Sequence, residues 1–293
     1  MNILVTGATG FVGSSLIPSL VEEGHTVRAM TRDVASYDQP DDVSVVEGDL
    51  LKPSTLDGDF EDIDVAYYLV HSLQTGKDFA ERDREAAHNF AQAASTADVD
   101  RVIYLGGLGE TSGELSEHLS SRREVEAILK TGEYSLTTLR AAIIIGQGSS
   151  SFAMIRQLAG RLPIMITPKW VRTKCQPIAI QDVIAYLTGV LDVPKTAGET
   201  YEIGGPEVLT YEEILKRTAK QLGNKPIIIP VPVLTPKLSV YWVDLVTNVP
   251  KSVAHPLIYG LKNPVVVTDD RIRDLVPIEL TPFDQAVTNA LES

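Results

Sequence analysis

The stretch that decides the fold lies at the start of the chain, where residues 2–13 read NILVTGATGFVG. Its first five residues form a short β-branched run, which predicts a β-strand. Gly7, Gly10 and Gly13 follow at once. The apolar residues behind them recur at helical spacing: Leu16, Ile17, Leu20 and Val21. A strand, a glycine turn and a helix in this order are typical of a unit that binds the phosphates of a dinucleotide.

Each glycine of the turn has a physical role. One permits the tight turn, one lets the backbone approach a pyrophosphate, and one lets the helix pack closely on the strand. The start of the helix then offers free N–H groups and a partial positive charge to the phosphates. We therefore predict that the following residues bind the cofactor: Gly7, Thr9, Gly10, Phe11, Val12 and Gly13.

Beyond the turn, short β-branched runs alternate with longer helical patterns, which predicts a parallel sheet covered by helices. The expected strands are residues 2–6, 26–31, 43–47, 65–70, 101–105, 135–144 and 199–203. The expected helices include residues 76–97, 116–130, 180–191 and 211–222. The prediction is an α/β fold with a doubly wound parallel Rossmann sheet. Residues 1–160 are expected to form mainly the Rossmann core. Residues 161–293 are expected to complete the sheet and to form a smaller, interleaved substrate-side region.

The end of the second predicted strand bears on which dinucleotide binds. Sites that prefer NAD usually place an acidic residue there, where it holds the ribose hydroxyls. Here Thr31 occupies that position, and Arg32 follows where it can pair with a 2′-phosphate. Asp33 is one residue further and can weaken this preference. We predict NADP as the cofactor, with NAD as the alternative.

Composition excludes several functions. A net charge of −13 over 293 residues opposes nucleic-acid binding, which requires a basic face. One cysteine excludes an intramolecular disulfide, and five scattered histidines predict no metal site. The chain has no apolar run of 18 residues and its start has no basic region or cleavage site, so we predict neither a transmembrane helix nor a secretory signal. The expected compartment is the cytoplasm.

Several further motifs carry a resemblance to a known family. They are TGATGFVG at the start, Gly48–Leu50, Tyr68–Ser72, Arg101–Leu105, Leu139–Ala141 and Gln181–Val183. Over most of its length the chain resembles extended or atypical short-chain dehydrogenases/reductases. Within that family it most resembles the group related to NmrA-like regulators and to the reductase-like accessory subunit of respiratory complex I. The resemblance implies that Asp49 and Leu50 contact the adenine.

The residues after the fourth predicted strand lie where ligands bind in such sheets. We predict that Leu69, Val70 and His71 contribute to the cofactor pocket. For His71 two interpretations stay open: it lines the pocket near the nicotinamide, or it only ends the strand.

The catalytic residues of the family are replaced here. Active members carry Ser or Thr after the fifth strand, then Tyr with Lys four residues later on a helix. Residues 106–109 read GGLG, so the hydroxyl is absent. Aligning Glu126 with a glutamate common in the family puts His118 at the tyrosine and Arg122 at the lysine.

A shift of one residue would instead put Leu119 and Arg123 at these positions and leave no acid. In the first alignment His118 and Arg122 lie on one helix face, because they are four residues apart. We predict that His118 donates the proton and that Arg122 binds the nicotinamide ribose. The alternative for His118 is a surface histidine near a helix start.

An apolar, proline-rich stretch covers residues 230–259 and includes Tyr241 and Trp242. In extended family members the C-terminal part covers the substrate, which suggests a quinone, an isoprenoid or another lipid-like ligand. Ordinary core with a dimer contact is an equal alternative. Peripheral contact with a membrane is a third, although the acidic net charge opposes anionic lipid. We expect a monomer or a homodimer.

Three functions follow from these observations. The first is an NADP(H)-dependent oxidoreductase acting on an apolar carbonyl, quinone or isoprenoid-like substrate without the usual Ser-Tyr-Lys set. The second is a non-catalytic dinucleotide-binding redox sensor or accessory subunit. The third is a sugar-nucleotide epimerase or dehydratase, against which stands the absence of the Tyr and Lys that move protons and hydride in those reactions.

Overall fold

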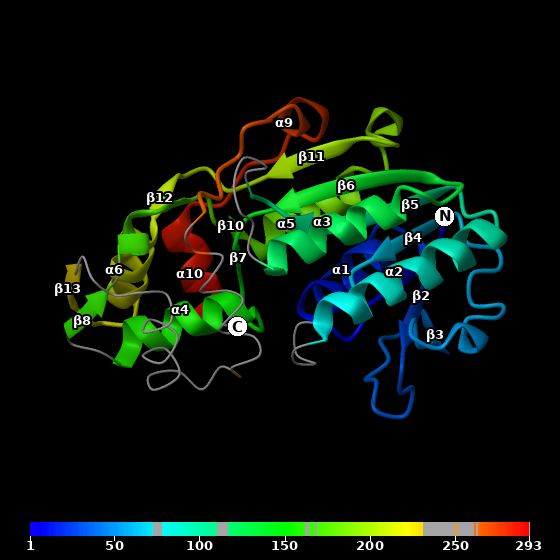
Figure 1. Cartoon of the computed structure of the whole chain (residues 1–293), viewed down its shortest axis with the longest axis horizontal. Coiled ribbons are helices and arrows are strands. Elements are labelled where there is room, and N and C mark those ends of the chain that lie inside the picture. The colour runs from blue at the N-terminus through cyan, green and yellow to red at the C-terminus, as the bar shows by residue number, and fades with distance from the viewer. Residues whose placement is uncertain are drawn as a thin grey trace.

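The computed structural model describes residues 1–72, 78–109, 117–161, 164–167, 169–230, 250, 261 and 263–292. Its centre is a seven-stranded parallel sheet with the order β11-β6-β5-β4-β1-β2-β3 (Figure 1). The strands are β1 (Asn2–Thr6), β2 (Thr26–Thr31), β3 (Val43–Glu47), β4 (Val65–Tyr68), β5 (Arg101–Gly107), β6 (Ser135–Ala141) and β11 (Thr200–Ile203). This is the doubly wound Rossmann order, extended by β11, so the predicted fold class is confirmed.

Helices cover both faces of the sheet because its strands are apolar on both sides. Ile3, Val5 and Tyr67 belong to the core cluster that α1 (Phe11–Glu22) and α5 (Ile180–Gly189) complete. Their chain neighbours Leu4 and Tyr68 belong to the opposite cluster, with α2 (Phe79–Thr96) and α3 (Glu117–Leu129). Successive side chains of a strand point to opposite faces, and the continuous burial of these strands is what the sequence pattern predicts.

Three predicted strands end at least two residues away from where the structure ends them. β4 ends at Tyr68, two residues early, and β5 continues to Gly107, where it still pairs with Ala141. β6 ends at Ala141 and a separate strand, β7 (Ile144–Ile145), leaves the sheet to pair with β10 (Ile178–Ala179). Apolar composition continues through these points, so it does not reveal where the chain turns away from its neighbour.

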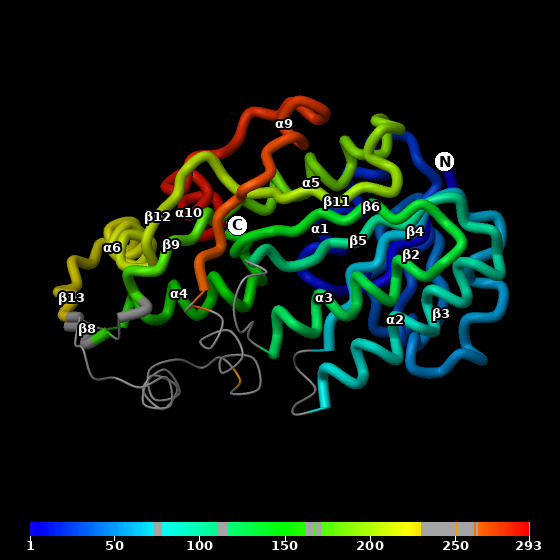
Figure 2. The backbone as a smooth tube through the Cα atoms, turned by 45° about the horizontal axis from the view of Figure 1, so that its top comes forward, coloured from blue at the N-terminus to red at the C-terminus, as the bar shows by residue number. Residues whose placement is uncertain are grey.

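A second core lies beside the carboxyl end of the sheet and is built mainly from α4 (Ser150–Arg161), α6 (Tyr211–Gln221) and α10 (Phe283–Glu292) (Figure 2). Its buried side chains include Phe152, Ile214 and Val287. Short elements accompany it: β8 (Ile164–Thr167), β9 (Lys174–Cys175), β12 (Leu209–Thr210), β13 (Ile227–Pro230) and a 3-10 turn at Lys169–Arg172. The remaining short elements contribute no residue to this core: α9 (Ile272–Leu275) and 3-10 turns at Pro53–Thr55 and Pro194–Thr196. Most of the apolar stretch 230–259 lies outside the described residues, so its predicted role and the division near residue 160 remain predictions.

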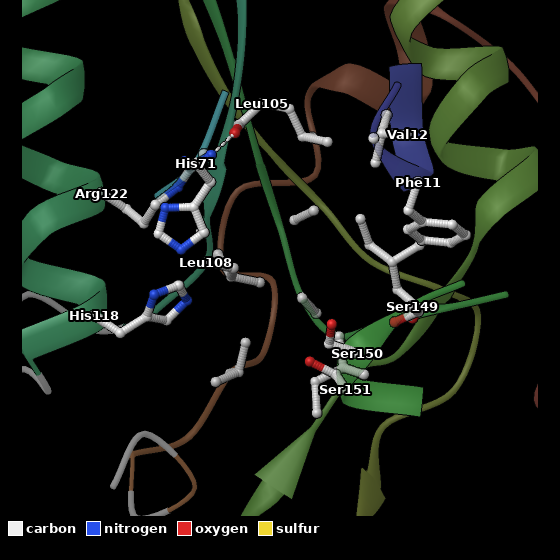
Figure 3. Close-up of a pocket in the computed structure, with 18 of the residues that line it drawn as sticks. Phe11, Val12, His71, Leu105, Leu108, His118, Arg122, Ser149, Ser150 and Ser151 are labelled. Carbon is white, nitrogen blue, oxygen red and sulfur yellow. Dashed lines mark hydrogen bonds between the residues drawn. The ribbon is translucent and has the colours of Figure 1, made fainter. Parts of the chain in front are cut away.

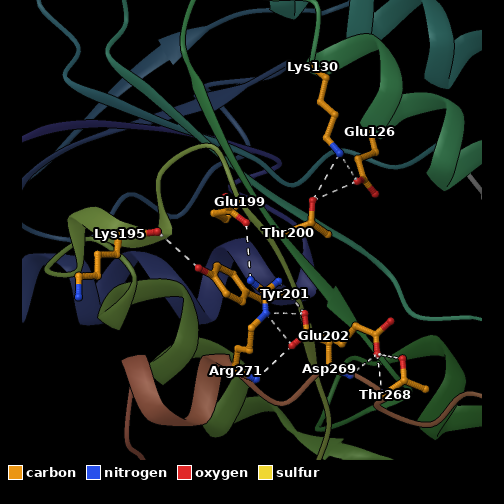
Figure 4. Close-up of polar contacts among 10 residues, drawn as sticks. All are labelled: Glu126, Lys130, Lys195, Glu199, Thr200, Tyr201, Glu202, Thr268, Asp269 and Arg271. Carbon is orange, nitrogen blue, oxygen red and sulfur yellow. Dashed lines mark hydrogen bonds and ion pairs between the residues drawn. The ribbon is translucent and has the colours of Figure 1, made fainter.

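The edge strand β11 is covered by polar contacts (Figure 4). Arg271 lies over the ring of Tyr201 at 5.3 Å from its centroid and pairs with Asp269 at 2.8 Å. Glu202 accepts hydrogen bonds from the backbone N–H and the hydroxyl of Thr268 at 2.7 and 2.9 Å. Among the described helices, none has both the length and the apolar composition that crossing a bilayer requires.

Candidate cofactor and substrate site

A cavity of about 440 Å³ opens at the carboxyl ends of β1, β4, β5 and β6. It reaches from the glycine turn before α1 to the start of α3, and then to the second core. Among the predicted site residues it is lined by Gly7, Gly10, Phe11, Val12, Gly13, Leu69, His71, His118 and Arg122. In an open α/β sheet this is where ligands bind, beside the point at which the strand order reverses between β1 and β4.

The turn before α1 admits only glycine at two positions. Gly7 has φ +72°, and a Cβ there would lie 2.8 Å from the carbonyl oxygen of Leu69. A Cβ on Gly13 would lie 2.3 Å from the carbonyl oxygen of Gly7. The backbone N–H of Gly10 donates to that same oxygen at 2.9 Å, which closes the turn. The backbone can therefore form the cavity wall at close range to a ligand.

The start of α1 is free to bind an anion. Its N-cap is Gly10, which offers no side-chain cap, and no acidic residue lies in the first helical turn. The N–H groups of Phe11, Val12 and Gly13 thus begin the helix without an intrahelical acceptor. They present the positive end of the helix dipole to the cavity. These features fit the pyrophosphate of a dinucleotide.

The residues predicted at the adenosine end lie at the ends of β2 and β3, apart from the cavity lining. Thr31 is buried and Arg32 is exposed. The Asp33 carboxylate accepts hydrogen bonds from the backbone N–H groups of Ala35 and Ser36 at 3.1 and 3.3 Å. That carboxylate is therefore held by hydrogen bonds within its own turn, and the Arg32 side chain is exposed beside it at the end of β2.

Asp49 and Leu50 occupy the end of β3. The Asp49 carboxylate accepts a hydrogen bond from the N–H of Leu51 at 3.1 Å and pairs with Lys52 at 3.7 Å. Leu50 is buried in the core beneath α2, and its carbonyl accepts a hydrogen bond from Asn89. Thr9 is exposed in the glycine turn.

His71 is held by a buried carboxylate. Its Nδ1 lies 2.8 Å from Oδ2 of Asp83, which is 1% exposed near the start of α2. Asp83 also accepts hydrogen bonds from the backbone N–H of Ser72 at 2.7 Å and from the hydroxyl of Ser121 at 3.3 Å. Burial alone would raise the pKa of Asp83, but the hydrogen bonds from His71 and Ser72 reverse that effect and lower it. Asp83 is therefore an ionised carboxylate inside the protein.

His118 lies next to His71 on the same wall of the cavity, with their ring centroids 5.0 Å apart (Figure 3). Burial, reinforced by the charges of His71 and Arg122, lowers the pKa of His118 to about 3. His118 is thus neutral at physiological pH. Two buried ring nitrogens, Nε2 of His71 and Nδ1 of His118, have no hydrogen-bond partner within the described part of the chain.

Arg122 joins the ends of two strands. Its guanidinium donates hydrogen bonds to the carbonyl oxygens of Leu105 and Val70, and it lies over the ring of Tyr104 at 4.9 Å. The hydroxyl of Tyr104 donates in return to the carbonyl oxygen of Arg122 at 3.0 Å. Arg122 thus lines the cavity from a fixed position, and Val70 contributes through its backbone.

The structure adds residues that the sequence did not single out. Asp83 reads as one charge among several in an amphipathic helix, so nothing local marks it as buried. The rest of the lining is mainly apolar and includes Leu108, Met154 and Val265, and the hydroxyl side chains of Ser150 and Ser151 lie across the cavity from the histidines (Figure 3). Ser149 caps α4 by accepting a hydrogen bond from the N–H of Phe152 at 3.3 Å.

Comparison with known proteins agrees with this site. Residues 7–150 match the family described as NAD(P)H-binding. The chain is 26% identical to the ceramide reductase of Caulobacter vibrioides, across 99% of this chain and 89% of that protein. It is 26% identical to the mitochondrial NADH dehydrogenase (ubiquinone) 1 alpha subcomplex subunit 9 of Arabidopsis thaliana, across 95% of this chain and 75% of that protein. The solved structure of MoeE5 in complex with UDP-glucuronic acid and NAD has a TM-score of 0.74 at 18% identity, covering 100% of this chain and 98% of that one.

The sheet order, the glycine turn and the match of residues 7–150 together define an NAD(P)-binding Rossmann protein. Its sequence relatives include a reductase and a subunit of the respiratory complex, so the chain is similar to atypical members of the short-chain dehydrogenase/reductase family. The predicted resemblance is therefore confirmed.

Proposed function

We propose that the protein is an NAD(P)H-dependent reductase of an apolar carbonyl compound. The observation that carries the proposal is that one cavity is continuous from the glycine turn, past His71 after β4 and His118 of α3, to a mainly apolar wall. A dinucleotide whose pyrophosphate binds at α1 would reach this wall with its nicotinamide end. The carbonyl group of a substrate would then lie between the cofactor and His118.

A bound reduced nicotinamide supplies a hydride, and with it two electrons, to the carbonyl carbon. The protein has to position the two ligands and provide a proton to the carbonyl oxygen. Arg122 would contact the cofactor from the side of β4 and β5, since its guanidinium is already held there by hydrogen bonds to the carbonyl oxygens of Val70 and Leu105. Arg32, exposed at the end of β2, would favour a 2′-phosphate and hence NADP.

His118 would act as a neutral hydrogen-bond donor. A histidine whose pKa lies near 3 does not carry a stored proton at physiological pH, so it does not act as an imidazolium acid. A neutral imidazole N–H can nevertheless polarise a carbonyl as negative charge develops on the oxygen. This modifies the role expected for His118 and keeps it in contact with the reacting oxygen.

The substrate we propose is lipid-like: a long-chain ketone, a quinone or an isoprenoid carbonyl. Leu108, Met154 and Val265 line the far wall, and burying apolar surface there contributes about 25 cal/mol per Å² to binding. The relative named ceramide reductase supports a lipid-like substrate as well. Against a sugar nucleotide stands the replacement of the family Tyr and Lys by His118 and Arg122.

A second candidate is a cofactor-binding accessory subunit or redox sensor that does not turn over. The relative in the respiratory complex favours it. It predicts tight dinucleotide binding and a stable protein partner, without hydride transfer to any acceptor.

The test is NADPH oxidation by the purified protein against long-chain ketones, quinones and enones. We expect turnover with at least one of them, and in His118→Ala a loss of about 10²-fold or more with cofactor binding retained. Glu212→Ala, which alters an exposed pair on α6, is the matched control and should leave turnover unchanged. Cofactor binding with no turnover on any acceptor would instead support the accessory or sensor role.

A further inference from the structure

The proton that a carbonyl reduction consumes has no source in His118 alone, because that histidine is neutral. The neighbouring His71 differs in one respect. It has a buried carboxylate against its Nδ1, whereas no carboxylate contacts the ring of His118 among the residues described. A histidine paired in this way can carry a proton that its partner stabilises.

The hydrogen bonds around Asp83 fix which nitrogen of His71 is available. An ionised carboxylate can only accept hydrogen bonds, so Nδ1 of His71 is the protonated nitrogen. The same carboxylate is held by the N–H of Ser72 and the hydroxyl of Ser121, which leaves it little freedom to rotate. Nε2 of His71 is therefore the nitrogen that can gain or lose a proton, and it is buried without a partner in the described chain.

Besides Asp83, which holds Nδ1, the neighbour of His71 that can exchange a proton is His118. The two rings lie on the same wall of the cavity with centroids 5.0 Å apart and planes inclined at 44° (Figure 3). Nδ1 of His118 is the other buried nitrogen of this wall without a partner within the described ranges.

We propose that Asp83, His71 and His118 form a proton relay, in which Asp83 positions His71 and His71 supplies through His118 the proton that the substrate oxygen takes up. This inference rests on the proposed function and deepens it. Asp83 is a positioning residue, and His118 is the group that touches substrate.

The relay conserves protons and electrons at each step. The carbonyl carbon receives the hydride from the reduced nicotinamide, which becomes the oxidised cofactor, and the π electron pair moves to the oxygen. The oxygen takes the proton of His118 Nε2 while His118 Nδ1 takes the Nε2 proton of the His71 imidazolium. His71 is left neutral with its Nδ1–H on Asp83, and His118 is left neutral as its other tautomer. Solvent protonates His71 again before the next turnover, and His118 returns to its first tautomer. No step charges His118, in agreement with its lowered pKa.

Among the described residues, the ionisable groups that face His71 are Asp83 from α2 and His118 and Arg122 from α3. Burial and the charge of Arg122 lower the pKa of His71, and the hydrogen bond and charge of Asp83 oppose them. Removing the negative charge of Asp83 should therefore lower the pKa of His71 further. Because the reduction needs His71 protonated, its rate should fall as pH rises through that pKa.

The experiment compares Asp83→Asn with Arg84→Gln, a neighbour on α2 whose exposed pair with Glu124 lies away from His71. The first readout is the pH profile of kcat/KM for carbonyl reduction. The second readout does not need turnover. It is the set of ¹⁵N chemical shifts of the imidazole nitrogens, which report the tautomer of each of the five histidines. The signals of His71 and His118 are assigned by their loss in His71→Gln and His118→Gln. We expect His71 as the Nδ1–H tautomer in the wild type and in Arg84→Gln, and a mixture in Asp83→Asn.

We also expect Asp83→Asn to lose on the order of 10²-fold in kcat/KM at neutral pH and to move the profile to lower pH. An Nε2–H tautomer of His71 in the wild type would overturn the relay. So would a uniform loss in Asp83→Asn without movement of the profile, since a merely structural role would give that result. Absence of hydride transfer by the wild type would refute the proposed function and the relay with it. Turnover with an unmoved profile would refute the relay alone.

Discussion

Glu126→Ala tests how α3, which carries His118 and Arg122, is fixed to the sheet. Glu126 is 4% exposed and accepts two hydrogen bonds from Arg140 of β6 at 2.8 and 2.9 Å. It also pairs with Lys130 at 3.0 Å and accepts a weaker contact from Thr200 of β11 at 3.4 Å (Figure 4). One carboxylate thus connects a helix to two strands.

The expected loss follows from these contacts. Removing one partner of a buried pair costs about 3–5 kcal/mol, because the other charge is left without compensation. Arg140 is 21% exposed and Lys130 49% exposed, so water replaces part of what they lose. We therefore expect a decrease of about 2–3 kcal/mol in the free energy of unfolding. With an unfolding entropy of about 2 cal/mol/K per residue, this corresponds to a fall in Tm of about 3–5 °C.

Urea unfolding, monitored by circular dichroism, measures this decrease in the free energy of unfolding. We expect a lower urea concentration at the midpoint and an unchanged dependence of the free energy on urea concentration. The matched control is Lys216→Ala, which removes an exposed pair with Glu212 on α6 and should cost about 0.5 kcal/mol or less. A Glu126→Ala midpoint as close to wild type as that of the control would refute the assignment of Glu126 as the anchor of α3.

Three further outcomes are expected. Gly13→Ala should abolish the thermal stabilisation by NADPH, because its Cβ would lie 2.3 Å from the carbonyl oxygen of Gly7. The control Gly160→Ala should retain that stabilisation, since its Cβ would make only an ordinary contact at 3.5 Å. Equal stabilisation of the two variants by NADPH would contradict the close approach at the turn. Arg32→Ala should weaken NADPH about tenfold or more and leave NADH nearly unchanged in isothermal titration, and a loss shared by both cofactors would remove Arg32 from the 2′-phosphate. Since the folded pKa of His118 is about 3 and an unfolded histidine titrates at about 6.5, stability should be full above that pH and fall as pH decreases, by up to about 1.4 kcal/mol per pH unit. Urea midpoints from pH 7 to 4 should show that fall in the wild type and a shallower one in His118→Gln, and identical slopes would count against burial of the neutral ring.

The phosphate end of the site was predictable and the proton-transfer end was only partly so. A glycine turn is local, because the turn, the strand before it and the helix after it are contiguous, and the structure places Gly7 and Gly13 where only glycine fits. Spacing by four residues also predicted that His118 and Arg122 share a face of α3. The burial of Asp83 depends on the packing of α2 against α3 and on the path of the chain after β4, and no local pattern records either.

The end of β2 shows a similar limit. Its sequence order, Thr31-Arg32-Asp33, left an acidic residue near the ribose position. The hydrogen bonds from Ala35 and Ser36 show that the Asp33 carboxylate serves its own turn. Such bonds depend on backbone torsion angles that residue identity suggests but does not determine.

The charged side chains along β11 protect the protein against aggregation at high concentration. A strand at the border of a sheet has unpaired N–H and C=O groups, which can recruit a strand from another molecule and begin aggregation. Here Glu202 accepts hydrogen bonds from Thr268, and the ion pair of Arg271 with Asp269 lies over Tyr201. A second strand would have to displace these charged groups and desolvate them before it could pair. The last segments of the chain thus keep the sheet from growing past its own border.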